Sequence, residues 1–305
     1  DDWLFVGLVH ELKNPGDIIP LSIAGKPIFL VKNNDNKITA FHKVCSQRCL
    51  KLVDEKKNVG KIIRCPYHAW SYNLKGQLKA APHIGGTNQH KPAGFNFSEH
   101  GLKPIRIHIW HDWIFLNFNG KAKKFEEYAK PLIKRFNDID LTKLKYVATL
   151  DFGKINTNWK FLIENFIEPY HVQFVHKTTT NQPLKDHYTF VDGKCYGSGI
   201  DVEKEDAKNG SALSVTSRYL SLFPNFIIGT YFPNQVGVYL NIPISPGVTS
   251  QKRIIYTTDS KEMTKKEIQT TKDIWWSVHK EDHEICERLQ EGRSSPASHS
   301  GGLLS

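Results

Sequence analysis

The stretch from Asn158 to His176, NWKFLIENFIEPYHVQFVH, constrains the fold more than any other part of the sequence. Its apolar residues recur at helical spacing, which predicts a helix from Trp159 to Glu168 with one face packed in the core. Glu164, Glu168 and His171 fall together on another face of that pattern. One side of this segment must therefore pack against a core, while the other presents acids and imidazoles to a polar site.

The histidines that close this stretch, His171 and His176, make it a candidate metal site. Two imidazoles and one distant carboxylate are the ligand set of a non-haem Fe(II) site that leaves positions open for oxygen. The sequence thus predicts an iron centre whose third ligand lies elsewhere in the chain.

Length and cysteine content limit what the chain can be. It has 305 residues, enough for two domains, and no run of about 18 apolar residues, so we expect no membrane span. Three of its five cysteines lie between Cys45 and Cys65 beside histidines, which suits metal binding in a reducing compartment better than disulfides. We therefore expect a cytoplasmic protein. The chain opens on Asp1 without a methionine and ends on Gly301–Ser305, so we expect further sequence to be missing.

The net charge of +10 comes mainly from lysine. It reflects either a general lysine bias in composition or a docking face for an acidic partner protein. Because the lysines are spread along the chain and form no basic tract, we expect no nucleic-acid binding.

The first part of the chain reads as short strands joined by turns. Asn33–Asn36 predicts a hairpin turn between strands Pro27–Val31 and Lys37–Phe41. This pattern is typical of a small antiparallel β domain.

The charged run Lys121–Lys124 predicts a linker, so we expect two domains, over residues 1–125 and 126–305. In the second domain a long helix is predicted from about Lys265, giving an α+β organisation. The strands predicted there are Lys145–Phe152, Ser217–Leu222, Phe223–Ile228, Gln235–Ile242 and Arg253–Thr258.

Two cysteine-containing loops lie in the first domain, Cys45-Ser-Gln-Arg-Cys49 and Cys65-Pro-Tyr-His68. A Cys-x-x-His turn presents a thiolate and an imidazole to one metal centre, and two such loops can enclose a cluster. The segment CPYHAWSYNLKG resembles the second cluster loop of Rieske [2Fe–2S] domains. By that resemblance Cys45 and Cys65 bind one iron of the cluster and His68 binds the other.

This chain departs from the Rieske pattern at two positions of the first loop. Gln47 stands where the family has its first histidine, and Cys49 where it usually has glycine. The Gln47 amide oxygen is a hard, weak donor, whereas Cys49 would give a cluster with three cysteines, one histidine and a lower potential. A third outcome is that no cluster assembles.

The same four residues, Cys45, Cys49, Cys65 and His68, also have the spacing of a structural zinc site. In that case the chain would be a catalytically impaired relative that acts as a binding module.

The segment ENFIEPYH followed by His176 resembles the mononuclear-iron motif of Rieske non-haem iron oxygenase α (terminal oxygenase) subunits. The resemblance implies that His171 and His176 bind Fe(II), that Glu168 takes the bridging acid position, and that Asn165 lies near the metal. It also implies a carboxylate ligand in the long C-terminal helix, which we assign to Asp282. We read the neighbouring acids as a solvated helix face, namely Glu281, Glu284 and Glu287, with His283 as a lesser rival ligand.

The family fold implied is an N-terminal antiparallel β Rieske domain followed by a helix-grip (START-like) catalytic domain. In that domain an antiparallel sheet wraps over the long helix, and the cavity between them holds substrate and iron. The aromatic residues expected in the cavity wall are Tyr219, Phe223, Phe226, Tyr231, Trp275 and Trp276.

The activity implied is that of a terminal oxygenase, which takes NAD(P)H-derived electrons from a reductase, sometimes through a ferredoxin, and uses O2 to hydroxylate or demethylate a small organic substrate. Family members form head-to-tail rings, commonly homotrimers, so that His68 of one chain would meet Glu168 and His171 of its neighbour. A glutamate at position 168 resembles members that act on quaternary ammonium compounds, which aromatic side chains bind through cation–π contacts. Aromatic acids and N-methyl groups are the alternatives.

Overall fold

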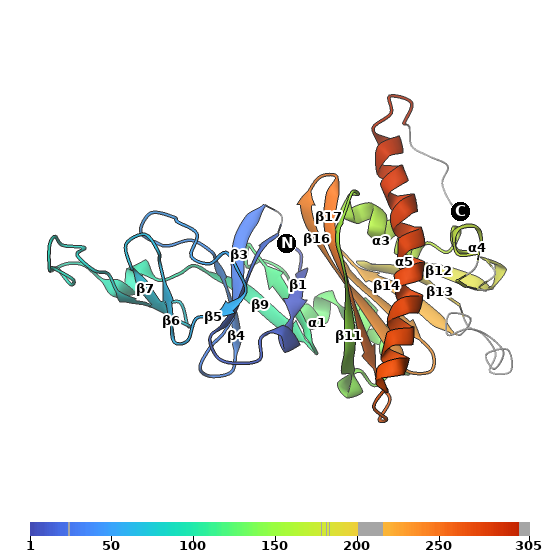
Figure 1. Cartoon of the computed structure of the whole chain (residues 1–305), viewed down its shortest axis with the longest axis horizontal. Coiled ribbons are helices and arrows are strands. Elements are labelled where there is room, and N and C mark those ends of the chain that lie inside the picture. Colours follow the sequence, from blue (N-terminus) through green and yellow to red (C-terminus); the bar gives the residue numbers. More distant parts are fainter. Residues whose placement is uncertain (24, 178, 181, 183, 201–215, 299–305) are drawn as a thin grey trace. The chain divides into compact units, whose positions relative to one another are not determined.

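The chain divides into two compact units, Asp1–Lys123 and Lys124–Ser305, in a computed structural model (Figure 1). The structure describes residues 1–23, 25–177, 179–180, 182, 184–200 and 216–298. The terminal segment Gly301–Ser305 lies outside these residues. The predicted fold is confirmed, because an antiparallel β unit is followed by a unit in which a sheet packs on a long helix.

The first unit contains two antiparallel sheets. The larger has seven strands in the order β1-β10-β9-β4-β3-β2-β5, and the smaller has the order β6-β7-β8. The predicted hairpin is present, with Phe29 opposite Phe41 and Asn36 in the left-handed conformation that asparagine tolerates. The strands are β1 Leu4–Leu8, β2 Asp17–Ile23, β3 Lys26–Lys32, β4 Ile38–His42, β5 Lys57–Asn58, β6 Ile62–Arg64, β7 Ser71–Asn73, β8 Leu78–Ala80, β9 Pro104–Trp110 and β10 Trp113–Asn117.

The second unit is built on one seven-stranded antiparallel sheet, ordered β11-β17-β16-β15-β14-β13-β12. Its predicted strands are present, but β15 begins at Phe226 and not at Phe223, since Pro224 has no N–H to donate to a ladder. The strands are β11 Lys145–Ile155, β12 His187–Asp192, β13 Cys195–Ile200, β14 Ser217–Leu222, β15 Phe226–Tyr231, β16 Gln235–Ser245 and β17 Val248–Thr257.

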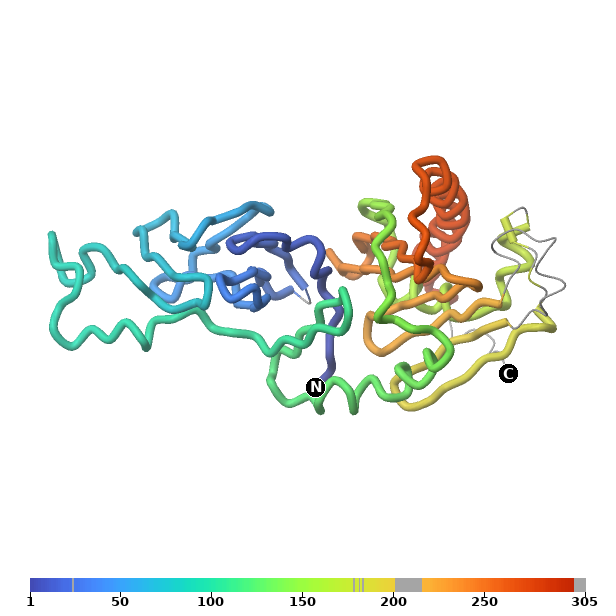
Figure 2. Tube along the Cα trace, turned by 90° about the horizontal axis from the view of Figure 1, so that it is seen from below, coloured from blue at the N-terminus to red at the C-terminus, as the bar shows by residue number. Residues whose placement is uncertain are grey.

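One face of this sheet is covered by α3 and α5 (Figure 2). The α-helices are α1 Phe125–Tyr128, α2 Lys130–Ile133, α3 Trp159–Ile167, α4 Val172–Val175 and α5 Lys265–Arg293. Short 3-10 helices are η1 Val9–Glu11, η2 Phe97–His100, η3 Lys134–Phe136, η4 Leu141–Lys143 and η5 Leu184–Asp186. Measured by length and hydropathy, none of the helices within the described residues is suited to crossing a membrane.

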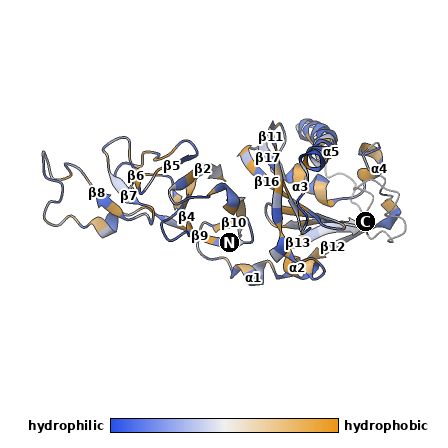
Figure 3. Ribbon diagram, turned by 60° about the horizontal axis from the view of Figure 1, so that its bottom comes forward, coloured by the Kyte–Doolittle hydropathy of each residue, from blue (hydrophilic) through white to orange (hydrophobic). Residues whose placement is uncertain are grey.

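Helix α5 begins at a capping box, in which Thr264 and Glu267 each satisfy a backbone N–H of the other. It is polar along most of its length, as its largely blue colour in Figure 3 indicates. Its buried residues are Trp275, Val278, His279 and Cys286, which recur at helical spacing and mark the face turned to the sheet.

Helix α3 ends where the predicted site begins. Its N-cap is Asn158, whose side chain accepts a hydrogen bond from the backbone of Lys160. Glu168 leaves the helix in an extended conformation, because a residue that precedes proline is disfavoured in helical geometry. The single turn of α4 then follows, with His171 at its N-cap and His176 at its C-cap.

We expect Gly76→Ala to lower the free energy of unfolding by about 2 kcal/mol. Gly76 has a positive φ of 79°, and a Cβ there would lie 2.4 Å from the Phe41 ring. The midpoint of urea unfolding measures the loss. Gly120→Ala is the matched control, since Gly120 has a φ of 71° and no atom within 4 Å of the added Cβ. An equal loss in both variants would contradict a role for the Phe41 contact.

Candidate metal centre

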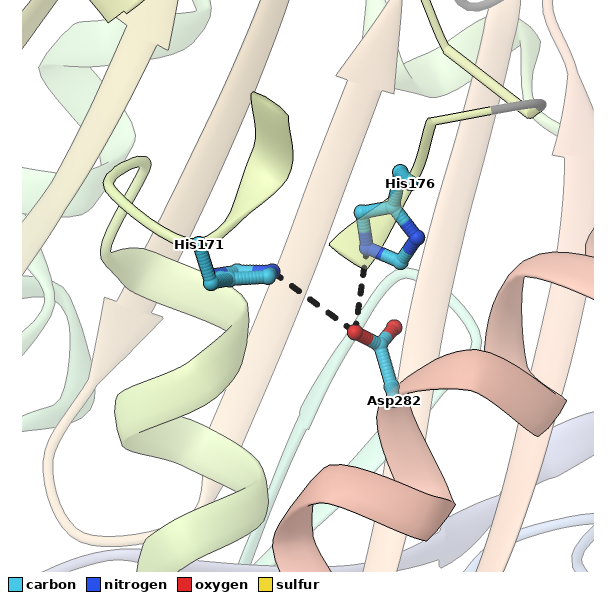
Figure 4. Close-up of side chains that lie close together, drawn as sticks. All are labelled: His171, His176 and Asp282. Carbon is cyan, nitrogen blue, oxygen red and sulfur yellow. Dashed lines mark ion pairs between the residues drawn. The ribbon is translucent and has the colours of Figure 1, made fainter. Parts of the chain in front are cut away.

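Three predicted ligands meet in the second unit (Figure 4). Oδ1 of Asp282 on α5 lies 3.1 Å from Nε2 of His176 and 3.6 Å from Nε2 of His171. Within the described residues, this is the one group of three or more His, Cys, Asp or Glu residues whose ligand atoms lie within 4.8 Å of one another. Two imidazoles and a carboxylate in this arrangement suit Fe(II) with open coordination positions.

A second carboxylate holds each imidazole from behind. Nδ1 of His171 lies 2.5 Å from Oε1 of Glu168, and Nδ1 of His176 lies 2.7 Å from Oε2 of Glu281. An imidazole that donates a proton from Nδ1 to a carboxylate leaves the Nε2 lone pair free for a metal. Both rings are therefore oriented for metal binding by the protein itself.

The prediction that Glu281 belongs to a solvated helix face was wrong. Its carboxylate also accepts a hydrogen bond of 2.7 Å from Thr179 Oγ1, so it joins α5 to the segment that follows α4. Glu284 is exposed, and Glu287 accepts a hydrogen bond from the backbone of Asn156 at the surface. His283 lies 2.6 Å from Gln251 of β17 and faces the sheet, away from the three ligands.

The charges of the ligands are strongly coupled. Burial, the largest single effect, disfavours the charged forms of both Asp282 and His176, but their mutual hydrogen bond and the charges around them together outweigh it. The pKa of Asp282 is lowered to about 2, and the pKa of His176 is raised to about 9 with help from Glu281. Asn165 adds a hydrogen bond of 2.8 Å to Oδ1 of Asp282. A metal ion would replace the proton that this pair holds.

A cavity of about 520 Å³ of atom-free space, which includes open solvent at its mouth, adjoins the three ligands. Three of the expected wall residues line it, namely Tyr219, Tyr231 and Trp275. The other three do not. Phe226 is buried on the opposite face of β15, while Phe223 and Trp276 are 41% and 49% exposed. Trp276 misses the cavity because adjacent residues of a helix point about 100° apart.

The cavity wall also includes residues that the sequence did not indicate, from three helices, the sheet and the segments on either side of α4. The full lining is Asn165, Phe166, Glu168, Pro169, His171, Val172, His176, Thr180, Gln182, Ser198, Tyr219, Tyr231, Tyr239, Trp275, Val278 and Asp282. The alternation of strand residues would have indicated Tyr239, whereas nothing in the sequence singles out Ser198 or Gln182.

In the first unit the two cysteine-containing loops also converge. Cys45 and Cys65 are buried and their thiols interact, and burial raises the pKa of Cys65. Gln47 Oε1 and His68 Nδ1 are buried without any hydrogen-bond partner. Two thiols, a bare imidazole nitrogen and a bare amide oxygen are a donor set that fits a two-iron cluster.

Cys49 differs from these four residues. Cys49 is exposed and has a φ of 57°. Glycine adopts this left-handed conformation without strain, which explains why glycine suits this position. Its N–H donates to the carbonyl of Cys45, which holds the turn. A structural zinc ion needs all its donors around one centre, and among the described residues Cys45, Cys49, Cys65 and His68 do not form such a group.

The fold and the centre together define a class of non-haem iron proteins. Such a protein has one antiparallel β unit that holds a cluster. Its second unit, made of a sheet and helices, carries a site of two histidines and one carboxylate. Residues 122–305 match the family described as ring hydroxylating alpha subunit (catalytic domain), and residues 2–91 match the Rieske [2Fe-2S] domain. The chain belongs to the Rieske non-haem iron oxygenases, as an α subunit.

Relatives of known activity cover this chain to different extents. The large oxygenase component of salicylate 5-hydroxylase from Ralstonia sp is 32% identical over 182 residues, which are 57% of this chain and 43% of that protein. The oxygenase subunit of carnitine monooxygenase from Escherichia coli K12 is 26% identical over 302 residues, 96% of this chain and 78% of that one. The aligned part of this chain thus spans less than half of the salicylate enzyme, and 39% of the glycine betaine monooxygenase oxygenase subunit from Pseudomonas aeruginosa.

Solved structures share the fold. The quaternary ammonium Rieske monooxygenase CntA in complex with L-carnitine superposes with a TM-score of 0.77 at 22% identity, covering 97% of this chain and 80% of that one. Naphthalene 1,2-dioxygenase with bound indole gives a TM-score of 0.75 at 20% identity, covering 100% and 78%.

We expect Glu281→Ala to lower the affinity for Fe(II) by roughly 10- to 100-fold, since the loss of a carboxylate behind a ligating histidine has effects of that size. Anaerobic Fe(II) titration of the apoprotein measures the change. Glu284→Ala, three residues along the same helix and exposed, should bind Fe(II) normally. His171→Ala and Asp282→Ala should empty the site, and unchanged iron content in either would refute the ligand set.

Proposed function

We propose that this chain is the terminal oxygenase component of a Rieske-type oxygenase, which uses O2 and NAD(P)H-derived electrons to hydroxylate or demethylate a small organic substrate. The observation that carries the proposal is the convergence of His171, His176 and Asp282 beside an aromatic-lined cavity. Bound at these residues, Fe(II) supplies the oxygen chemistry, and the cluster supplies single electrons.

Cys45, Cys65 and His68 are the proposed cluster ligands, with Gln47 and not Cys49 in the fourth position. The unpartnered Gln47 oxygen supports this choice, since a buried polar atom without a partner is costly unless a ligand satisfies it. An amide oxygen in place of an imidazole should lower the reduction potential, because imidazole ligation raises it in Rieske centres.

Residues of this chain would prepare the cavity for the reaction. Glu168 and Glu281 fix the imidazole rings, and Asn165 fixes the carboxylate of Asp282. The aromatic wall excludes water and holds the substrate against the site.

Glu168 is the proposed link to the electron donor. Its Oε1 faces His171 and its Oε2 accepts a hydrogen bond from the backbone of Tyr170, yet the side chain is 31% exposed. Beside it Tyr170 and Phe174 stack edge to face on the surface, 50% and 56% exposed. This exposed acid in an apolar setting supports a homotrimer in which His68 of one chain reaches Glu168 of the next, with a reductase, or a ferredoxin, as the external donor.

For the cluster, we expect anaerobically purified protein to contain iron and labile sulfide, and to give a Rieske-type EPR signal on reduction. Gln47→His should raise the midpoint potential, because a second imidazole replaces the amide. Cys49→Ser should leave both the spectrum and the potential unchanged. Zinc without labile sulfide, or loss of the signal in Cys49→Ser, would contradict the assignment.

If Glu168 is the link to the electron donor, Glu168→Ala should abolish product formation driven by NADH, while the protein still binds iron at saturating Fe(II). Glu164→Ala, exposed on α3 and without a bond to either histidine, is the control and should retain activity. Product formation that survives in Glu168→Ala would exclude the bridging role.

A further inference from the structure

The sheet face under the cavity holds a buried positive charge. Arg253 of β17 has no exposed surface, and its Nη1 donates to the Tyr239 hydroxyl. Nε and Nη2 make no well-formed hydrogen bond, although the guanidinium interacts with the Tyr231 hydroxyl, and no ion pair between described residues includes it. The negative charge of Asp282 acts on the guanidinium only at longer range. Because a buried guanidinium without a contacting carboxylate is costly for the folded state, its retention calls for a ligand or a function.

Arg253 lies directly behind the cavity wall. Its guanidinium carbon is 3.4 Å from the centre of the Trp275 ring, 4.9 Å from that of Tyr239 and 5.4 Å from that of Tyr231. All three rings line the cavity. Gly237 of β16 provides the space on the other side, since a Cβ there would lie 2.5 Å from Nη2.

The cavity wall in front of this charge carries one further donor. The Tyr231 hydroxyl is buried among the wall residues and interacts with the guanidinium, so its own proton is available to a ligand. Hydroxyl and guanidinium groups can all donate hydrogen bonds, and a carboxylate can accept about four. This end of the cavity is therefore suited to an anion.

The same features of the cavity disfavour a cationic ligand. A trimethylammonium group binds to an open aromatic face, and the guanidinium of Arg253 already covers the Trp275 ring. Its charge would also repel a second cation across a low-dielectric wall. The face of Trp275 that Arg253 covers is therefore not open to a cation–π contact with a quaternary ammonium group.

We infer that Arg253, with Tyr231, forms a carboxylate-selective subsite, and that the substrates are carboxylic acids held with the carboxylate toward Arg253 and the carbon to be oxidised toward Asp282. With the rings as they stand, the charge of Arg253 acts on a ligand through the aromatic wall. Direct contact between the guanidinium and the ligand requires one of the rings to turn. The inference rests on the proposed oxygenase function for the fate of the substrate, but the selectivity is a property of binding alone.

Two pairs of probes test the inference by binding. Glycine betaine and choline share a trimethylammonium group and differ in a carboxylate against a hydroxymethyl group, and salicylate and salicylamide differ in a carboxylate against an amide. Calorimetric titration of the anaerobic, iron-loaded protein should give at least tenfold tighter binding of the carboxylate in each pair. Failure of both carboxylates to bind, or equal affinity within the pairs, overturns the inference.

Arg253→Met assigns the selectivity to this residue. Methionine keeps much of the side-chain volume and removes the charge. The two members of each probe pair should then bind with about equal affinity, while Tm stays the same or rises. Arg218→Met is the control, because Arg218 lies in the same sheet but is paired with Asp138, and it should keep the preference. A drop in Tm with unchanged preference would make Arg253 purely structural. Intact selectivity without turnover would refute the oxygenase function alone.

Discussion

The hydrogen bonds from His171 to Glu168 and from His176 to Glu281 are the constraint on which the rest of the catalytic unit depends. Each bond fixes which ring nitrogen carries the proton and therefore where the other lone pair points. The extended backbone before Pro169, the single turn of α4 and the length of α5 serve to bring these four side chains to one place.

Much of this centre could be predicted from sequence because its elements are local. Helical periodicity located α3 and α5 closely, and the resemblance supplied Asp282, which lies 106 positions beyond His176. The role of Glu281 could not be predicted, since an acid on a polar helix looks the same whether it faces water or an imidazole. Arg253 was equally hidden, because its burial depends on Gly237 of a neighbouring strand and on Trp275 of a helix.

The cluster loops show the same division between local and tertiary information. The sequence left Gln47 and Cys49 as rival donors, and spacing could not choose between them. The conformation of the turn does distinguish them, since it exposes Cys49 and leaves the Gln47 oxygen buried and unpaired. Family membership thus defines the fold and the centre, while Gln47 and Cys49 are positions at which this chain differs from the family pattern.

Helix α5 carries both ends of the cavity on one rigid element. Trp275, which stacks on Arg253, and Asp282 are separated by seven residues, so they lie about 10 Å apart along the helix axis. The helix therefore fixes the distance between the end of the cavity that binds the carboxylate of a ligand and the metal site where the ligand is oxidised. Because the helix holds this spacing constant, ligand length, together with charge, becomes a criterion of selection.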